Sequence, residues 1–330
     1  MRSPSSQYSM LLRRSTKLPL LLAFAAPLAF GACADGDTPL EPTDTPAAGE
    51  PASPDLALVT TGQRILFSSS RKGSMDLFKS DPQGDNLVRL TSFGKYEAEA
   101  TWSWDNKHIA MVRPRLDANK VEHADIYLMN ADGTGKRWAL PAPTPWPIRF
   151  PAWSPDGTHL LATIFLPGGA LLVKLKPSTG ELSYVMSDEQ ITPGSDASYD
   201  ATGQYIVYVT SNGLWVNWIF NGWQYGAFGS QTPITSPVFS PDHRKIAFTK
   251  TVSGNADIYV WSDVSNTIKR LTTHASYDGL PTWSPDGSKI AFESARSGQS
   301  QIWTMNASTG GGLTRITHTS TGETDPAWSH

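Results

Sequence analysis

The sequence predicts an all-β fold, a six-bladed β-propeller, and three observations lead to this prediction. An aromatic motif recurs six times, each copy is followed by the same series of short strands and turns, and the two ends of the folded region are complementary. Glycine (27 residues) and proline (25 residues) are plentiful, while charged residues make up only 17% of the chain. This composition suits short strands joined by tight turns better than long helices.

The recurring motif is an aromatic anchor residue followed by Ser-Pro-Asp-Gly or a variant of it. The six anchors are Trp102, Trp153, Tyr199, Phe239, Trp283 and Trp328. Their spacing varies from 40 to 51 residues, which is the length of one four-stranded propeller blade. The six anchors therefore predict six blades.

The residues that follow each motif repeat one order of strands and turns. Ser-Pro-Asp-Gly suits a type I turn, because proline fixes φ at the second position and glycine closes the fourth. Alternating strands follow, such as 289–292 and 257–260, and an outer strand ends in Leu-Thr, as at 271–272. Alternation with a period of two indicates strands that bury one face.

The two ends of the folded region supply different strands of one blade. Residues 64–67 match the second strand of the repeat, and residues 326–329 match the first strand. We expect the N-terminal strands to pair with the C-terminal strand and close the ring. A closed ring leaves no exposed sheet edge.

The Trp-Ser-Pro-Asp-Gly motif, the Asp-Ile-Tyr strand at 257–259 and the Leu-Thr ending resemble the WD40-like PD40 repeats of TolB-type propellers. The resemblance covers about 62–330 and implies the fold and a tendency to bind partners. Only a tether precedes the repeats, so we expect the N-terminal α/β domain of TolB to be absent, which leaves a role in the Tol machinery without support. Tyr199 and Phe239 mark the two blades that depart most from the motif.

The N-terminus has the pattern of an export signal. Arg13, Arg14 and Lys17 precede an apolar run, 18–30, that is shorter than the roughly 20 residues of a membrane-spanning helix. Gly31-Ala32-Cys33 follows and resembles a lipobox, although Phe30 stands where that family usually has leucine. We expect residues 1–32 to be a signal peptide and Cys33 to be lipidated. The alternative is an ordinary secretory signal with an incidental cysteine.

Residues 33–61 are rich in proline and acidic residues and lack apolar periodicity. This composition predicts a flexible, lipid-anchored tether before the propeller of 62–330. Because Cys33 is the only cysteine, no internal disulfide is expected. We expect a periplasm-facing lipoprotein that meets the membrane through its lipid anchor only. Ala34 in place of an aspartate after the cysteine favours the outer membrane.

Charge and motifs narrow the classes of function. Without residues 1–32 the chain carries a net charge of about −7, which argues against a nucleic-acid partner. Neither a His-Glu-x-x-His nor a Gly-x-Ser-x-Gly motif is present, so we assign no catalytic residue, metal or cofactor. Asp156, Asp242 and Asp286 are interpreted as turn formers.

Six acidic residues stand three or five positions before an anchor, in four of the six repeats. They are Glu97, Glu99, Asp196, Asp278, Glu323 and Asp325. In a propeller these loops gather at one mouth of the central channel, where converging carboxylates attract a cation or a basic peptide. The alternative is that they are ordinary solvated loop residues.

A second candidate surface is aromatic and consists of Trp218, Trp223 and Tyr225, near the turn at 221–222. Exposed rings there would stack on a sugar or grip a partner chain, and the alternative is packing under an outer strand. We expect a non-catalytic binding or scaffolding propeller of the bacterial cell envelope with a protein or peptide partner. The alternatives are a propeller-only carbohydrate-active enzyme of lyase or glycosidase type and a purely structural lipoprotein.

Overall fold

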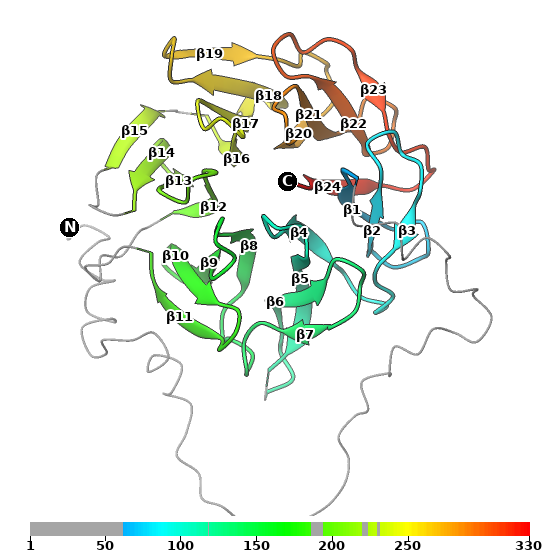
Figure 1. Cartoon of the computed structure of the whole chain (residues 1–330), viewed down its shortest axis with the longest axis vertical. Coiled ribbons are helices and arrows are strands. Elements are labelled where there is room, and N and C mark those ends of the chain that lie inside the picture. The colour runs from blue at the N-terminus through cyan, green and yellow to red at the C-terminus, as the bar shows by residue number, and fades with distance from the viewer. Residues whose placement is uncertain (1–61, 118, 186–193, 220–223, 230–231) are drawn as a thin grey trace, which may run out of the picture.

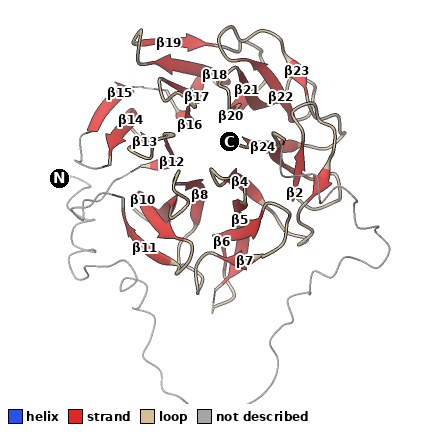
Figure 2. Ribbon diagram, viewed as in Figure 1, coloured by secondary structure: helices blue, strands red, loops and turns tan. Residues whose placement is uncertain are grey.

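The computed structural model describes residues 62–117, 119–185, 194–219, 224–229 and 232–330. These residues form six four-stranded antiparallel sheets arranged as blades around a central axis, and the described part contains no helix (Figure 1, Figure 2). The described part of the chain therefore has no helix that could cross a membrane. The predicted all-β, six-bladed propeller is confirmed.

Every blade has the same order of strands from the axis outward. The innermost strands all end at an aromatic anchor and are β4 (Ala98–Trp102), β8 (Ile148–Trp153), β12 (Ser195–Tyr199), β16 (Ile234–Phe239), β20 (Asp278–Trp283) and β24 (Glu323–Trp328). The second strands are β5 (His108–Leu116), β9 (Leu160–Leu166), β13 (Tyr205–Thr210), β17 (Lys245–Val252), β21 (Lys289–Ser294) and β1 (Ile65–Ser69).

The third strands are β6 (Glu122–Asn130), β10 (Gly169–Lys176), β14 (Gly213–Trp218), β18 (Asn255–Ser262), β22 (Gln301–Asn306) and β2 (Asp76–Ser80). The outermost strands are β7 (Arg137–Trp138), β11 (Glu181–Tyr184), β15 (Gln224–Gly229), β19 (Thr267–Arg270), β23 (Thr314–Arg315) and β3 (Val88–Arg89). Most outermost strands are short, which limits the exposed edge of each blade.

The sheet that contains both ends of the propeller has the order β24-β1-β2-β3. Strand β24 pairs antiparallel with β1, with Trp328 opposite Ile65, and Figure 1 shows the two strands side by side. Beyond this ladder, the Ser329 amide donates to the Arg64 carbonyl at 2.8 Å, and the Arg64 amide donates to Ser329 Oγ at 2.9 Å. Strands from the two ends of the described chain therefore share one blade.

The Ser-Pro-Asp-Gly turns are held by hydrogen bonds within the motif. Ser284 Oγ donates to Asp286 Oδ1 at 2.6 Å, and the Gly287 amide donates to the Ser284 carbonyl at 2.8 Å. Hydrogen bonds from Ser284 and Ser288 keep the pKa of Asp286 below its ordinary value. Each such aspartate thus serves as a turn acceptor, as the sequence indicated.

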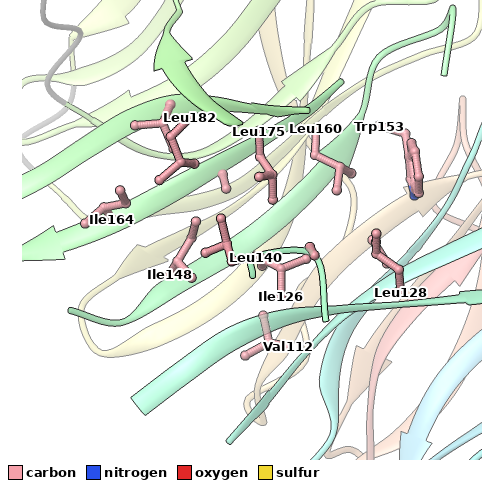
Figure 3. Close-up of a cluster of buried hydrophobic side chains, with 14 of the residues drawn as sticks. Val112, Ile126, Leu128, Leu140, Ile148, Trp153, Leu160, Ile164, Leu175 and Leu182 are labelled. Atoms are coloured by element: carbon pink, nitrogen blue, oxygen red, sulfur yellow. The ribbon is translucent and has the colours of Figure 1, made fainter. Parts of the chain in front are cut away.

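The core lies between neighbouring blades. In the cluster of Figure 3, side chains such as Val112, Ile126, Ile148 and Leu160 from adjacent blades pack together and are fully or almost fully buried. Burial of this apolar surface is the main favourable contribution to folding.

The aromatic anchors connect blades through hydrogen bonds as well as packing. The indole N–H of Trp102 donates to the Ala327 carbonyl at 3.2 Å, and that of Trp283 donates to the Val238 carbonyl at 3.2 Å. Each acceptor lies one residue before the anchor of the preceding blade. The anchors therefore set the contact between blades.

Replacing Trp283 by alanine is expected to lower the free energy of unfolding by about 3–5 kcal/mol, because a buried aromatic ring is lost. Trp283→Phe keeps most of the packing and loses the indole hydrogen bond, so its cost is expected to be smaller, about 1–2 kcal/mol. Urea denaturation followed by circular dichroism measures both values. Equal costs for the two variants would contradict a packing role for the ring.

Candidate functional site: an acidic mouth of the channel

Each innermost strand contains one residue in the left-handed backbone region, three positions before its anchor. These residues have φ between 54° and 56° and are Glu99, Phe150, Asp196, Ser236, Leu280 and Asp325. At each of them the register with the second strand shifts, as between Gly279 and Thr282 in β20. A β-bulge of this kind redirects the side chain that it carries.

The six bulge residues line one cavity of about 350 Å³ at the start of the innermost strands. Three of them are acidic and come from three different blades: Glu99, Asp196 and Asp325. The structure therefore brings together half of the predicted carboxylates. We call these three side chains and their cavity the acidic mouth.

The carboxylates of the acidic mouth also connect adjacent blades. Glu99 Oε2 accepts a hydrogen bond from the Phe150 amide at 2.9 Å, and Asp196 Oδ2 accepts one from the Ser236 amide. Asp325 accepts one from the Glu99 amide. Each donor is the bulge residue of the next blade, so the bulge that redirects a side chain also presents an N–H group to its neighbour.

One cation lies among these acids. The Arg149 guanidinium donates to Glu99 Oε1 through Nε at 2.8 Å and also through Nη2. It lies over the Phe150 ring, with its central carbon 5.0 Å from the ring centroid, and the side chain is 39% exposed. Arg149 thus neutralises Glu99 and leaves the charges of Asp196 and Asp325 without a paired cation in the described chain.

The environment of the mouth disfavours ionised carboxyl groups. Burial raises the pKa of Asp325 to about 7, and the negative charges of Glu99 and Glu293 act in the same direction. Burial also raises the pKa of Asp196 to about 6, against the hydrogen bond from Ser236. These carboxyl groups therefore change charge between about pH 6 and pH 7.

Two tyrosines and a further glutamate surround the acids. Tyr96 and Tyr277 are 46% and 38% exposed, and both interact electrostatically with Asp325 and with Glu293 of β21. A Cβ atom on Gly279 would come within 2.1 Å of the Tyr277 hydroxyl, so glycine at this position leaves room for the tyrosine. The two tyrosines stand six positions before Trp102 and Trp283, a repeat register that sequence analysis overlooked.

The prediction that six carboxylates converge is wrong for Glu97, Asp278 and Glu323. These residues stand five positions before an anchor, and all three are fully buried. The prediction rested on repeat register, which places both sets of acids in the same loops. The bulge, however, turns the later residue away from the earlier one.

Two of the three buried acids bind groups of their own blades. Asp278 forms an ion pair with Arg296 at 2.8 Å, and Glu323 accepts from Ser69 Oγ at 2.8 Å and from the Arg71 guanidinium. Glu97 instead accepts from the Thr91 hydroxyl of the preceding blade at 3.0 Å, and burial raises its pKa to about 7. These acids therefore bind polar groups in the interior of the ring.

Of the four remaining predicted site residues, two lie in the described part of the chain and two lie outside it. Trp218 ends β14 with 36% exposure, and its ring stacks on Tyr205 with centroids 6.2 Å apart. Trp223 and Cys33 lie outside the described residues, while Tyr225 lies in β15 opposite Val216. In the described ranges, no three His, Cys, Asp or Glu side chains are grouped so that they could hold a metal ion.

The two kinds of acid are expected to respond oppositely to neutralisation. Asp278→Asn leaves Arg296 buried without its charge partner, so it should lower the free energy of unfolding by about 3 kcal/mol.

Because the pKa of Asp325 is raised to about 7 in the folded state, the free energy of unfolding falls as the pH rises from about 4 to about 7. Asp325→Asn removes this contribution, so the difference in stability between pH 5 and pH 8 should shrink.

Urea denaturation of the native chain and both variants at the two pH values measures these effects. A loss of stability in Asp325→Asn as large as that in Asp278→Asn would contradict the division into mouth and blade acids.

Comparisons with known proteins agree with the fold. Residues 224–330 match the family model described as PD40, TolB beta propeller domain, which confirms the expected TolB-type repeats. No curated protein sequence matches the chain.

Among solved structures, TolB from Acinetobacter baumannii is 19% identical with a TM-score of 0.63, over 82% of this chain and 67% of that chain. A putative TolB from Agrobacterium tumefaciens is 16% identical with a TM-score of 0.59, over 78% and 88%. An oligogalacturonate lyase in complex with manganese is 12% identical with a TM-score of 0.51, over 77% and 74%. At these identities the likeness shows a shared fold.

Proposed function

We propose that this TolB-type propeller is a non-catalytic binding module of the bacterial cell envelope, and that its acidic mouth binds a basic segment of a protein or peptide partner. One observation carries the proposal: bulges in three blades turn Glu99, Asp196 and Asp325 into one cavity. The left-handed bulge recurs in all six blades and therefore belongs to the fold, whereas the acids at three of the six positions give this mouth its charge.

The charge of the mouth selects a cationic ligand. Among the described residues that line the mouth, the acids Glu99, Asp196 and Asp325 outnumber the one cation, Arg149, and a further acid, Glu293, lies nearby. Carboxylates gathered in a partly desolvated cavity attract lysine and arginine side chains and increase the rate of encounter.

The tyrosines at the rim suit a peptide. Tyr96 and Tyr277 are partly exposed and lie near carboxylates, and aromatic rings bind cationic groups through their quadrupole. Tyrosine is also common in protein interfaces, because it combines apolar area with a polar hydroxyl. A cavity of about 350 Å³ suits a few side chains of a longer partner that spreads over the rim.

The sequence at the N-terminus supports the cellular location. The signal peptide predicted at 1–32 and the lipobox-like Gly31-Ala32-Cys33 support a lipid anchor before the predicted tether. The chain would then face the periplasm, at the outer membrane, and reach the membrane through the anchor alone.

Affinity capture from the envelope extract of the host tests the proposal. The bait is residues 34–330, beside a mouth variant with Glu99→Gln, Asp196→Asn and Asp325→Asn. A control variant changes the same number of charges at exposed positions and carries Asp85→Asn, Glu181→Gln and Asp263→Asn. We expect one protein to be retained by the native bait and the control, and lost from the mouth variant.

Equal capture by the native bait and the mouth variant would contradict the site. Turnover of a polysaccharide by the native chain would contradict the non-catalytic part of the proposal.

The affinity for a cationic peptide is expected to rise with pH. Asp196 and Asp325 lose their protons near about pH 6 and about pH 7, while lysine remains charged. Binding of octalysine should therefore be about tenfold tighter at pH 8 than at pH 5.5, or ~1.4 kcal/mol. Isothermal titration calorimetry measures this, and an Asp196→Asn, Asp325→Asn variant should lose the dependence. The same affinity at both pH values would contradict the assignment.

A further inference from the structure

The end of the channel opposite the acidic mouth is aromatic. All innermost strands run in the same direction, so their anchors gather where the strands end. There they line a cavity of about 260 Å³, whose walls include Trp102, Trp104, Trp153, Trp283 and Trp328 together with Pro241 and Pro285. We call this cavity the aromatic end.

The described chain begins at the rim of the aromatic end. Trp328 Nε1 donates to Gln63 Oε1 at 3.3 Å, so the second described residue contacts an anchor. Gly62, Gln63 and Arg64 also line a larger adjoining cavity of about 770 Å³. The two cavities share Trp102, Pro285, Ser329 and His330. Whatever precedes Gly62 in the chain therefore starts beside the aromatic cavity.

The residues before Gly62 have a composition that suits an aromatic surface. Between 34 and 61 there are six acidic residues, no basic residue and five prolines, namely Pro39, Pro42, Pro46, Pro51 and Pro54. Proline-rich segments adopt an extended helix without internal hydrogen bonds and bind grooves lined by aromatic side chains. Their restricted backbone loses little entropy on binding.

Charge favours the aromatic end over the acidic mouth. The carboxylates Glu99, Asp196 and Asp325 would repel a segment with six acidic residues. At the aromatic end, Arg64 makes no ion pair within the part of the chain that the structure describes. It lies near the buried Lys79, whose Nζ donates to the Ala131 carbonyl at 2.7 Å. Because Lys79 is buried, the charged side chains on the wall of the adjoining cavity are Arg64 and Lys107, which are balanced there by Asp105 and Asp132. This side of the rim therefore lacks the excess of negative charge that would repel the segment from the acidic mouth.

The length of the connection permits contact. Pro54 precedes Gly62 by eight residues, which span at most about 28 Å when extended. We propose that the proline-rich segment 39–54 binds across the aromatic end of its own ring, with Pro51 and Pro54 nearest the rim. Given a lipid anchor at Cys33, as in the proposed function, this contact would turn the aromatic end toward the membrane and the acidic mouth away from it.

Paramagnetic broadening in NMR tests the contact in the chain 33–330. A nitroxide is attached to Ala52→Cys in a Cys33→Ser background, and the indole N–H signals of the tryptophans are recorded. Trp102, Trp104 and Trp328 report on the aromatic end. Trp146, two residues before β8, is the internal control, because Trp153 ends the same strand at the aromatic end.

We expect the signals of the three aromatic-end tryptophans to lose more than half of their intensity, while that of Trp146 is retained. Replacing all five prolines by serine in the spin-labelled chain should weaken the broadening at the aromatic end, because an unbound tether brings the label to the rim only part of the time. Unchanged broadening in this variant would overturn the proposal. Equal broadening of all signals, or broadening of Trp146 alone, would overturn the proposal. Broadening in a mixture of spin-labelled chain and separately isotope-labelled chain would assign the contact to a second copy and would also overturn it.

Discussion

The left-handed residue in each innermost strand is the constraint on which the geometry of the channel depends. A bulge interrupts the ladder between the first two strands of every blade, so the backbone N–H at that point needs an acceptor from outside its sheet. Where the preceding blade carries Glu99, Asp196 or Asp325 at its own bulge, that carboxylate is the acceptor. The Leu280 amide instead donates to Thr249 Oγ1 of the preceding blade at 3.0 Å.

This arrangement gives each mouth carboxylate two roles. One oxygen can hold the neighbouring blade while the group as a whole faces the cavity, so the charge of the site and the contact between blades are coupled. The common direction of the innermost strands then separates two chemistries along the channel, with acidic and tyrosine side chains at one end and tryptophans at the other. A ring built from one repeated unit thereby obtains two unlike ends.

The fold could be predicted from the sequence because its signals repeat. Six anchors, turns such as that at Asp286, and complementary ends each indicate the same ring. The site was only half predictable, because a left-handed bulge at a residue such as Glu99 or Leu280 has no signature in the sequence, unlike one at glycine. Repeat register therefore placed Glu97 and Glu99 at one mouth of the channel, although the bulge separates them.

Other residues of the site carried weak signals or none. Tyr96 and Tyr277 occupy equivalent positions in two repeats, and aligning the loops as well as the strands would have found them. Arg149 and Glu293 each occur in one blade without an equivalent residue in the others, so comparing the repeats could not reveal them. Their contacts depend on how the blades meet around the axis.

Titration of the carboxyl carbons of Asp196 and Asp325 tests whether the bulges gather carboxyl groups in a desolvated mouth. Carbon-13 NMR of the selectively labelled chain gives the midpoint for each residue. The account predicts midpoints at about 6 for Asp196 and about 7 for Asp325. Midpoints near 4 for both residues, the ordinary value for an aspartate in water, would show that the side chains are solvated separately and would contradict the account.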